Sequence, residues 1–382
     1  MNSTDSDIRV LCVVGARPNF MKIAPIMRAF NRSNSGIAPR LLHTGQHYDT
    51  AMMASFFDQL GIPKPDVDLE VGSASHAQQT AEIMKRFEPE LDSWQPDLIL
   101  VVGDVNSTIA CALVAVKKGI PVIHVEAGLR SFDRGMPEEI NRVLTDRISE
   151  LLFTTERDAE VNLLNEGIAN KSIHFVGNVM IDTLFLNRAK AVPATQTLSQ
   201  LKDGAGFLED DNGFAVLTLH RPSNVDDPDV LKRLLETLVE ISESLPIIFP
   251  VHPRTADRIE KAGLGSLLEK GRIATLPPLG YLELLGLMES ARAVLTDSGG
   301  IQEETTALGV PCITLRENTE RPITVTEGTN TIVGSDPERI MACFRDVMRG
   351  GGKAGRVPEL WDGQAAERIA RVIREWGNAH KP

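Results

Sequence analysis

The sequence predicts an α/β protein with two Rossmann-like, doubly wound parallel sheets, and three observations favour this fold class. The chain of 382 residues is long for a single hydrophobic core and suits two α/β domains. Short and nearly continuous apolar segments recur along it, as in parallel strands that are covered on both faces. Segments with helical periodicity lie between these runs, and such alternation is typical of doubly wound sheets.

Twelve apolar segments are predicted strands, six in each half of the chain. In the first half they are IRVLCVVGA (8–16), RLLHTG (40–45), DLILVVGD (97–104), PVIHVEAG (121–128), ELLFTT (150–155) and IHFVGN (173–178). In the second half they are FAVLTLH (214–220), PIIFPVHP (246–253), RIATLPPL (272–279), AVLTDSGG (293–300), PCITLR (311–316) and NTIVG (330–334).

The two halves are separated by a segment with weak apolar periodicity. In residues 189–213 Asp and Gly accumulate, which indicates a linker. Near the C-terminus, residues 362–376 have the pattern of an amphipathic helix. Its apolar face consists of Ala366, Ile369, Ile373 and Trp376. That face predicts a packing surface elsewhere in the protein.

Composition excludes several classes of function. The formal net charge of −12 gives no electrostatic reason to bind nucleic acid or an anionic membrane. The N-terminus lacks the pattern of a signal peptide, and no apolar run approaches the roughly 20 residues of a membrane span. Cys12 and Cys312 lie in predicted strands, and Cys111 and Cys343 in predicted helices, without CxxC spacing. We therefore expect four buried free thiols in a cytoplasmic protein, with neither disulfides nor a zinc site.

The segment GARPNFMKIAP (15–25) follows the first strand and begins a predicted helix. Gly15 allows a tight turn, and Pro18 suits an early helical position. Arg17 and Lys22 then lie near a helix N-terminus, which favours anions. Neither GxGxxG nor GxxxxGK[ST] is present, so the standard dinucleotide and P-loop motifs are excluded. The pattern alone leaves anion binding and a solvated surface equally open for Arg17.

Carboxylates follow two neighbouring strand candidates of the first half. Asp104 and Glu126 each stand at the end of an apolar run, where α/β proteins bind their ligands. Asp104 could instead be a helix cap. For Glu138 a structural role is the simpler explanation. Arg142 lies four residues later, and a helical salt pair would suffice to explain a carboxylate at this position.

In the second half, the strongest signal is TDSGGIQEE (296–304), where an apolar strand ends and a helix begins. The backbone amides of Ser298, Gly299 and Gly300 could bind an anion. A carboxylate one turn later, at Glu303 or Glu304, could accept hydrogen bonds from both hydroxyls of a ribose. The alternative is a favourable charge near a helix N-terminus.

Two further strand ends in the second half carry basic side chains. His220 and Arg221 follow one strand, and His252 and Arg254 follow the next. A lone histidine is usually structural. Two histidines at strand ends, each with an arginine nearby, fit a diphosphate better.

In their order along the chain, these segments resemble the non-hydrolysing UDP-N-acetylglucosamine 2-epimerases. The matching motifs, found between about residue 8 and about residue 335, are GARPNFMKIAP, HTGQHYD, GDVNST, HVEAGLRSFDRGMPEEINRVLTD, VGNVMIDTL, HRPSNVDD, TDSGGIQEE and ERPITVTEGTN. The resemblance implies two Rossmann-like domains in a glycosyltransferase-B arrangement, with the nucleotide in the cleft. Residues 1–185 would form the N-terminal domain, completed by helix 360–382, and residues 186–359 the nucleotide-binding domain.

The resemblance also implies an activity. It is the interconversion of UDP-N-acetylglucosamine (UDP-GlcNAc) and UDP-N-acetylmannosamine (UDP-ManNAc) by a homodimer, for cell-surface polysaccharide biosynthesis, without NAD, metal or other cofactor. UDP would be eliminated to give 2-acetamidoglucal and then added back. The catalytic residues implied are Asp104, Glu126, Glu138 and His220. The implied contacts to the UDP-sugar are Arg17, Lys22, His252, Ser298, Gly299, Gly300, Glu304 and Arg321.

The chain departs from the family pattern at three places. Val105 replaces a common threonine after Asp104, and the usual HRREN is HRPSN here. Some bacterial members bind UDP-GlcNAc at an allosteric site, for which Gln46 and Arg221 are the candidates retained here. Asp49 and Pro222 differ, so regulation by substrate stays open.

Several alternatives remain open from the sequence. The substrate could be a related UDP-sugar such as a diacetamido-glucuronate, which would need an extra cation near its C6 carboxylate. A hydrolysing epimerase, a glycosyltransferase-B transferase and a non-catalytic nucleotide-sugar sensor share the expected fold. The sequence also leaves open which carboxylate is the base and which is the acid.

Overall fold

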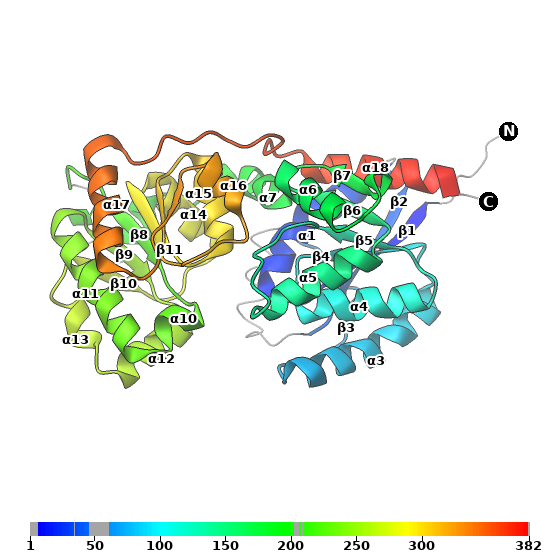
Figure 1. The fold of residues 1–382 in the computed structure, drawn as a ribbon, viewed down its shortest axis with the longest axis horizontal. Helices are drawn as coiled ribbons and strands as arrows, with labels where there is room; N and C mark the ends of the chain where they lie inside the picture. Colours follow the sequence, from blue (N-terminus) through cyan, green and yellow to red (C-terminus); the bar gives the residue numbers. More distant parts are fainter. Residues whose placement is uncertain are drawn as a thin grey trace. The chain divides into compact units, whose positions relative to one another are not determined.

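The computed structural model describes residues 7–33, 35–45, 61–199, 201, 206–207 and 210–380. The chain divides into two compact units, one of Met1–Leu186 with Glu359–Pro382 and one of Asn187–Pro358. Each unit contains a parallel sheet flanked by helices (Figure 1). The predicted fold class is therefore confirmed.

The first unit contains a sheet with the strand order β3-β2-β1-β4-β5-β6-β7, in which all neighbouring strands are parallel. The strands are β1 (Ile8–Val14), β2 (Ile37–His43), β3 (Val67–Asp68), β4 (Leu98–Val102), β5 (Val122–Val125), β6 (Leu151–Thr154) and β7 (Ile173–Phe175). The strand order reverses between β1 and β4, and ligands of such sheets bind near that reversal.

The helices of the first unit follow its strands in alternation, as the sequence predicts. They are α1 (Arg17–Phe30), α3 (His76–Trp94), α4 (Asn106–Lys117), α5 (Pro137–Ile148), α6 (Arg157–Asn165), the 3-10 helix η1 (Asn170–Ser172), α7 (Val179–Arg188) and α18 (Ala365–His380). Every residue of β4 is buried, because helices cover both faces of this central strand.

The second unit contains a sheet with the order β10-β9-β8-β11-β12-β13, again parallel throughout. Its strands are β8 (Ala215–Thr218), β9 (Ile247–Pro250), β10 (Ile273–Leu276), β11 (Ala293–Thr296), β12 (Cys312–Thr314) and β13 (Asn330–Ile332). Its helices are α8 (Ala194–Leu198), α10 (Pro222–Val225), α11 (Pro228–Ser244), α12 (Pro253–Lys261), α13 (Gly265–Leu268), α14 (Tyr281–Ser290), α15 (Gly299–Leu308), α16 (Pro322–Thr326) and α17 (Pro337–Gly350).

The C-terminal helix α18 belongs to the first unit and packs against α1 (Figure 1). Its predicted apolar face has Ala366, Ile369 and Ile373 buried, while Trp376 is partly exposed. A side chain at Gly377 would meet Ile8 of β1, so the helix lies close to the sheet at this point. The amphipathic pattern is thus explained by packing within this unit.

The cysteines occupy the predicted element types, and all four are free thiols. Cys12, Cys111 and Cys312 are buried, as expected. Cys343 is partly exposed, because it lies on α17 beside a surface cavity. Within the described residues, no helix is both long enough and apolar enough to cross a membrane.

Candidate active site

In the first unit, an ion pair joins the ends of two segments far apart in the sequence. Strands β1, β4 and β5 are neighbours, so the residues that follow them meet at one edge of the sheet. Glu126 directly follows β5, and its Oε2 atom pairs with Nζ of Lys22 on α1. Both side chains are buried, with exposed fractions of 3% and 8%. The structure therefore brings these two predicted site residues together.

Gly103, at the end of β4, leaves room for this ion pair. Its φ is +67°, and an added Cβ would lie 3.2 Å from Nζ of Lys22 and 3.8 Å from Oε2 of Glu126. Asn19 of α1 holds the same corner together, since its Nδ2 donates to the carbonyl of Val102 at 3.1 Å. A side chain at position 103 would crowd the pair and strain the backbone.

Asp104 has a cationic partner that the sequence did not reveal. Nη2 of Arg142 donates to Oδ2 of Asp104 at 2.5 Å, and Nη1 of Arg142 donates to Oε2 of Glu139 at 2.6 Å. The helical salt pair between Glu138 and Arg142, which was the alternative explanation for Glu138, does not form, because the guanidinium is buried between two other carboxylates. Glu138 is half-buried and makes no hydrogen bond or ion pair with the described residues.

Glu139 fixes the loop that precedes α5. Its Oε1 accepts from the Phe132 amide at 2.9 Å, and its Oε2 accepts from the Ser131 amide at 3.0 Å. Asp133 makes a local bond to the Gly135 amide at 2.9 Å. These two carboxylates therefore order the loop, and they remain outside the group of candidate acids and bases.

In the second unit, a buried carboxylate holds the candidate catalytic histidine. Asp297 follows β11, is fully buried, and pairs with Nδ1 of His220 at 2.9 Å. It also accepts from the amides of His220 and Arg221 at 2.9 and 2.8 Å, and from Nδ2 of Asn224 at 3.2 Å. Burial acts to raise the pKa of Asp297, but the charge of His220 and these hydrogen bonds hold it below its usual range. Asp297 thus stays a carboxylate that orients His220.

His252 lies beside His220, with ring centroids 5.6 Å apart. Its Nδ1 accepts from the Arg254 amide at 3.2 Å and caps α12. A ring nitrogen that accepts a hydrogen bond carries no proton, so this histidine presents Nε2 as its donor. His220 is partly exposed and His252 is exposed, which suits contact with a ligand.

The N-terminus of α15 offers amides to an anion. The Ser298 amide donates to Oγ1 of Thr296 at 2.9 Å, so this amide already has an acceptor within the protein, and the role of Ser298 as a contact to the UDP-sugar stays a prediction. The amides of Gly299 and Gly300 lie in the first turn, where an α-helix provides no acceptor. An added Cβ at Gly299 would lie 2.8 Å from Oε1 of Glu320, so a larger residue there would have to displace this carboxylate.

Glu304 is buried one turn further along α15, and its Oε1 accepts from Oη of Tyr281 at 2.9 Å. Burial raises the pKa of Glu304 to about 7, with a further increase from the charge of Glu303 and an opposing effect of the Tyr281 hydrogen bond. Arg321 is also buried and pairs with Glu303 at 2.9 Å and with Glu320 at 3.0 Å. Its guanidinium is therefore engaged within the protein.

Gln46 lies outside the described residues, and Arg17 begins α1 with a side chain that the structure does not describe. Arg221 is partly buried, with Nη2 3.9 Å from Oε1 of Glu320.

Among the described residues, no group of three or more His, Cys, Asp or Glu side chains could hold a metal ion.

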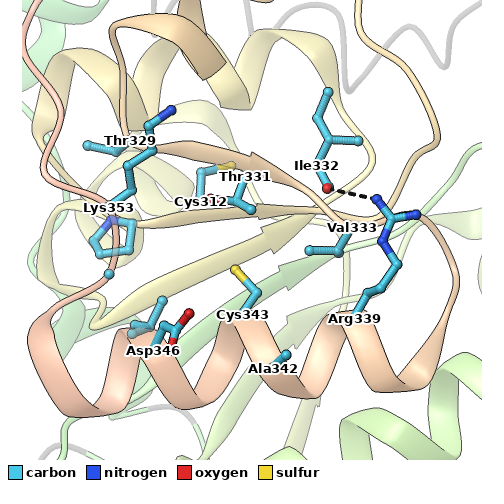
Figure 2. A pocket seen from close by; sticks show the side chains of 13 residues that line it. Cys312, Thr329, Thr331, Ile332, Val333, Arg339, Ala342, Cys343, Asp346 and Lys353 are labelled. Carbon is cyan, nitrogen blue, oxygen red and sulfur yellow. Dashed lines mark hydrogen bonds between the residues drawn. The ribbon is translucent and has the colours of Figure 1, made fainter.

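A cavity of about 490 Å³ lies elsewhere in the second unit, between α17 and strands β12 and β13 (Figure 2). Cys312, Cys343 and Asp346 are among its lining residues, and none of the described site residues is. The cavity and the candidate site at the strand ends therefore share no residues.

Sequence reasoning missed three partners of the candidate site. From the sequence, Arg142 was considered only as a helical partner of Glu138. Asp297 was considered only as part of the glycine-rich segment that follows a strand. Tyr281 carried no signal at all, because a single tyrosine in a helix is ordinarily part of the core. The first two depend on which strands are neighbours, and the third depends on the packing of α14 against α15.

Comparison with known proteins identifies relatives over most of the chain. A family model described as UDP-N-acetylglucosamine 2-epimerase matches residues 29–374. A UDP-N-acetylglucosamine 2-epimerase of Methanococcus maripaludis is 42% identical over 340 residues, covering 88% of this chain and 91% of the relative. A UDP-2,3-diacetamido-2,3-dideoxy-D-glucuronate 2-epimerase of Pseudomonas aeruginosa is 39% identical over 370 residues, covering 96% and 99%.

Solved structures agree with these relatives. The UDP-GlcNAc 2-epimerase of Methanocaldococcus jannaschii, in complex with UDP-GlcNAc and UDP, gives a TM-score of 0.83 at 40% identity, covering 96% of this chain and 100% of that one. The enzyme of Neisseria meningitidis bound to UDP-GlcNAc gives 0.84 at 30% identity, with the same coverage. The family model and these relatives span nearly the whole sequence, and the chain therefore belongs to the UDP-N-acetylglucosamine 2-epimerase family.

Proposed function

We propose that this protein interconverts UDP-GlcNAc and UDP-ManNAc by eliminating UDP and adding it back through 2-acetamidoglucal. One observation carries the proposal: two ion-paired carboxylates, Glu126 with Lys22 and Asp104 with Arg142, stand at adjacent strand ends in a chain of this family. Relatives solved with UDP-GlcNAc support the choice of substrate.

The chemistry explains why several carboxylates are needed. The C2 hydrogen of the sugar is not next to a carbonyl group, so its direct removal is very unfavourable. If the C2 proton leaves together with UDP from C1, a C1–C2 double bond forms and no isolated carbanion is required. UDP then adds back to C1 while a proton is delivered to the opposite face of C2. The reaction therefore requires a base, an acid and cations for the departing diphosphate.

The residues of the first unit supply the acid and base groups. Lys22 and Arg142 hold Glu126 and Asp104 in fixed positions, while Glu138 lies in the first turn of α5 without a partner among the described residues. These three carboxylates are our candidates for moving the C2 proton. Lys22 also adds positive charge beside the reacting carbons.

The second unit supplies groups for the nucleotide. His220, oriented by Asp297, can donate a hydrogen bond to the diphosphate as it departs. The amides of Gly299 and Gly300 suit a phosphate, and Glu304 suits the ribose hydroxyls. In this proposal Arg17 and His252 add further contacts to the diphosphate, and Arg321 acts through the carboxylates that it holds.

Proton NMR of the protein with UDP-GlcNAc in heavy water tests this function. We expect UDP-ManNAc to appear with deuterium at C2, and deuterium also to enter C2 of the remaining UDP-GlcNAc. Release of free ManNAc would identify a hydrolase instead. Unchanged substrate without deuterium would contradict both forms of epimerase for this sugar.

A second substrate is favoured by one relative and one side chain. The Pseudomonas aeruginosa enzyme for UDP-2,3-diacetamido-2,3-dideoxy-D-glucuronate is 39% identical, close to the 42% of a UDP-GlcNAc enzyme. Arg134 is exposed on the loop before α5 and makes no ion pair with the described residues, which makes it the side chain to test as the cation that a C6 carboxylate requires. Assays of both sugars with wild type and Arg134→Ala distinguish them, because only turnover of the glucuronate should fall in the variant.

We further propose that the enzyme works in the cytoplasm as a homodimer, without NAD or metal, to supply cell-surface polysaccharide synthesis. The family resemblance supports each of these assignments. His220, which Asp297 orients, can donate a hydrogen bond to a diphosphate without a metal ion.

A further inference from the structure

A buried histidine in β5 connects two loops of the candidate site. His124 is fully buried, and its Nε2 lies 2.8 Å from the carbonyl oxygen of Gly103. A carbonyl oxygen can only accept, so Nε2 carries a hydrogen and donates it. Its Nδ1 lies 2.6 Å from Oδ1 of Asp146 on α5. Both ring nitrogens are thus engaged, and the ring has a single orientation.

Asp146 extends this connection to a third segment. Its Oδ2 accepts from the Gly128 amide at 3.1 Å and pairs with Nη2 of Arg130 at 2.7 Å. Arg130 in turn holds Glu166 through two hydrogen bonds of 2.7 and 2.6 Å. The carboxylate of Asp146 is fully buried, so each of these bonds forms in a region of low dielectric.

The contacts of His124 and Asp146 reach every segment that carries a candidate acid or base. Gly103 directly precedes Asp104, and Gly128 comes two residues after Glu126. Asp146 lies on the helix whose first turn contains Glu138. The three carboxylates therefore share one buried point of attachment, although none of them touches it directly.

We propose that His124 and Asp146 are positioning residues that set the relative placement of Asp104, Glu126 and Glu138. The inference rests on the proposed function, because it assigns the pair to the same reaction. At φ +67°, Gly103 determines how the following peptide is turned, and His124 fixes its carbonyl. A displacement of about 1 Å among reacting groups can lower turnover by about 10²-fold, even when binding is intact.

Two substitutions of His124 each keep one of its two hydrogen bonds and remove the other. In His124→Gln the side-chain amide can reach the place of Nε2, which keeps the donor to Gly103 and loses the bond to Asp146. In His124→Asn the amide reaches the place of Nδ1, which keeps Asp146 and loses Gly103. We expect kcat to fall by about 10-fold or more in His124→Asn and by less in His124→Gln, while UDP affinity stays within about 2-fold of wild type.

The matched control is His174→Asn. His174 lies in β7 of the same sheet, is half-buried, and has no link to the candidate acids. Burial lowers its pKa, which marks it as an ordinary core histidine. We expect this variant to lose stability and keep wild-type kcat. If folded His124→Asn also keeps wild-type kcat, the positioning role is overturned while the proposed function stands.

Backbone NMR provides a readout that needs neither substrate nor turnover. In His124→Gln and His124→Asn, the amide resonances of Asp104 and Glu126 should move, whereas in His174→Asn they should stay. If neither His124 variant folds, Asp146→Asn is measured in the same way. Unmoved resonances would overturn the inference even if the wild-type protein proves inactive on UDP-GlcNAc, so the two failures are distinguishable.

Discussion

At the scale of single residues, the three candidate acids differ in what surrounds them. Asp104 and Glu126 are each held by a buried cation, whereas Glu138 is half-buried with no partner among the described residues. A buried ion pair leaves an uncompensated charge when one member is neutralised. The three positions should therefore have similar importance for turnover and unequal importance for stability.

The first prediction concerns Asp104→Asn, Glu126→Gln and Glu138→Gln. Each should lower turnover by at least about 10²-fold, the low end for positioned acid–base groups. Only Glu126→Gln should also cost about 3–5 kcal/mol of unfolding free energy, because it leaves Lys22 buried without its carboxylate, whereas Arg142 keeps Glu139 in Asp104→Asn. Kinetics and urea unfolding measure the two effects. Normal turnover in any variant would remove that residue from the catalytic set.

Glu304 gives a pH dependence whose sign follows from its burial. Burial raises its pKa to about 7, from 4.5 in the unfolded chain, so the folded state binds this proton more tightly. Stability should therefore fall as pH rises between these values, by roughly 3 kcal/mol in total. In Glu304→Gln this loss should be absent. Urea unfolding at about pH 4.5 and about pH 8 measures it, and identical pH profiles for the variant and wild type would contradict it.

At the scale of elements, the sequence was most informative about the strands. Strands such as β4 are buried on both faces, and such strands can be recognised in the sequence as continuous apolar runs. The two-residue strand β3 left none, because a strand so short has no periodicity. Residues that follow strands were likewise easy to select as site candidates.

The partners of those residues were not predictable from one sequence. Helical spacing suggested Glu138 for Arg142, but the guanidinium binds Asp104, which belongs to another strand end. Asp297 orients His220 only because β8 and β11 are neighbours in the sheet. Such contacts depend on strand order, and strand order is fixed by the packing of the whole unit.

An element-scale prediction concerns the attachment of α18. Asp182 of α7 is buried, and its carboxylate accepts from the amides of Ala365 and Ala366 at 3.1 and 2.7 Å. Asp182→Ala leaves two buried donors at the helix N-terminus without an acceptor, which should cost about 1–3 kcal/mol. Amide hydrogen exchange in α18 should accelerate more than in β4.

The control for this prediction is Asp362→Ala at the same end of the helix. The Asp362 side chain is 41% exposed and pairs with Arg368, and ion pairs that solvent reaches contribute about 0–1 kcal/mol. Equal exchange rates in the two variants would show that the Asp182 carboxylate does not hold the helix.

At the scale of the whole molecule, the proposed homodimer has a candidate surface on α5. Ile140 and Leu144 lie one turn apart there, with exposed fractions of 46% and 51%. Light scattering should give twice the chain mass of 41.8 kDa, and Leu144→Glu should weaken the dimer. Val357→Glu in the second unit, at a site 48% exposed, should leave it intact. A wild-type mass of one chain would contradict the dimer.

The central claim is that the bond between C1 and the diphosphate oxygen breaks during epimerisation. Positional isotope exchange tests it most directly, with UDP-GlcNAc that carries oxygen-18 in the bridge between C1 and the β-phosphorus. If UDP is eliminated and returns, its β-phosphate can rotate before C1 is attacked again. We therefore expect the label to spread into the non-bridging β-phosphate oxygens at a rate comparable to epimerisation. Epimerised product with all of its label still in the bridge would contradict the account.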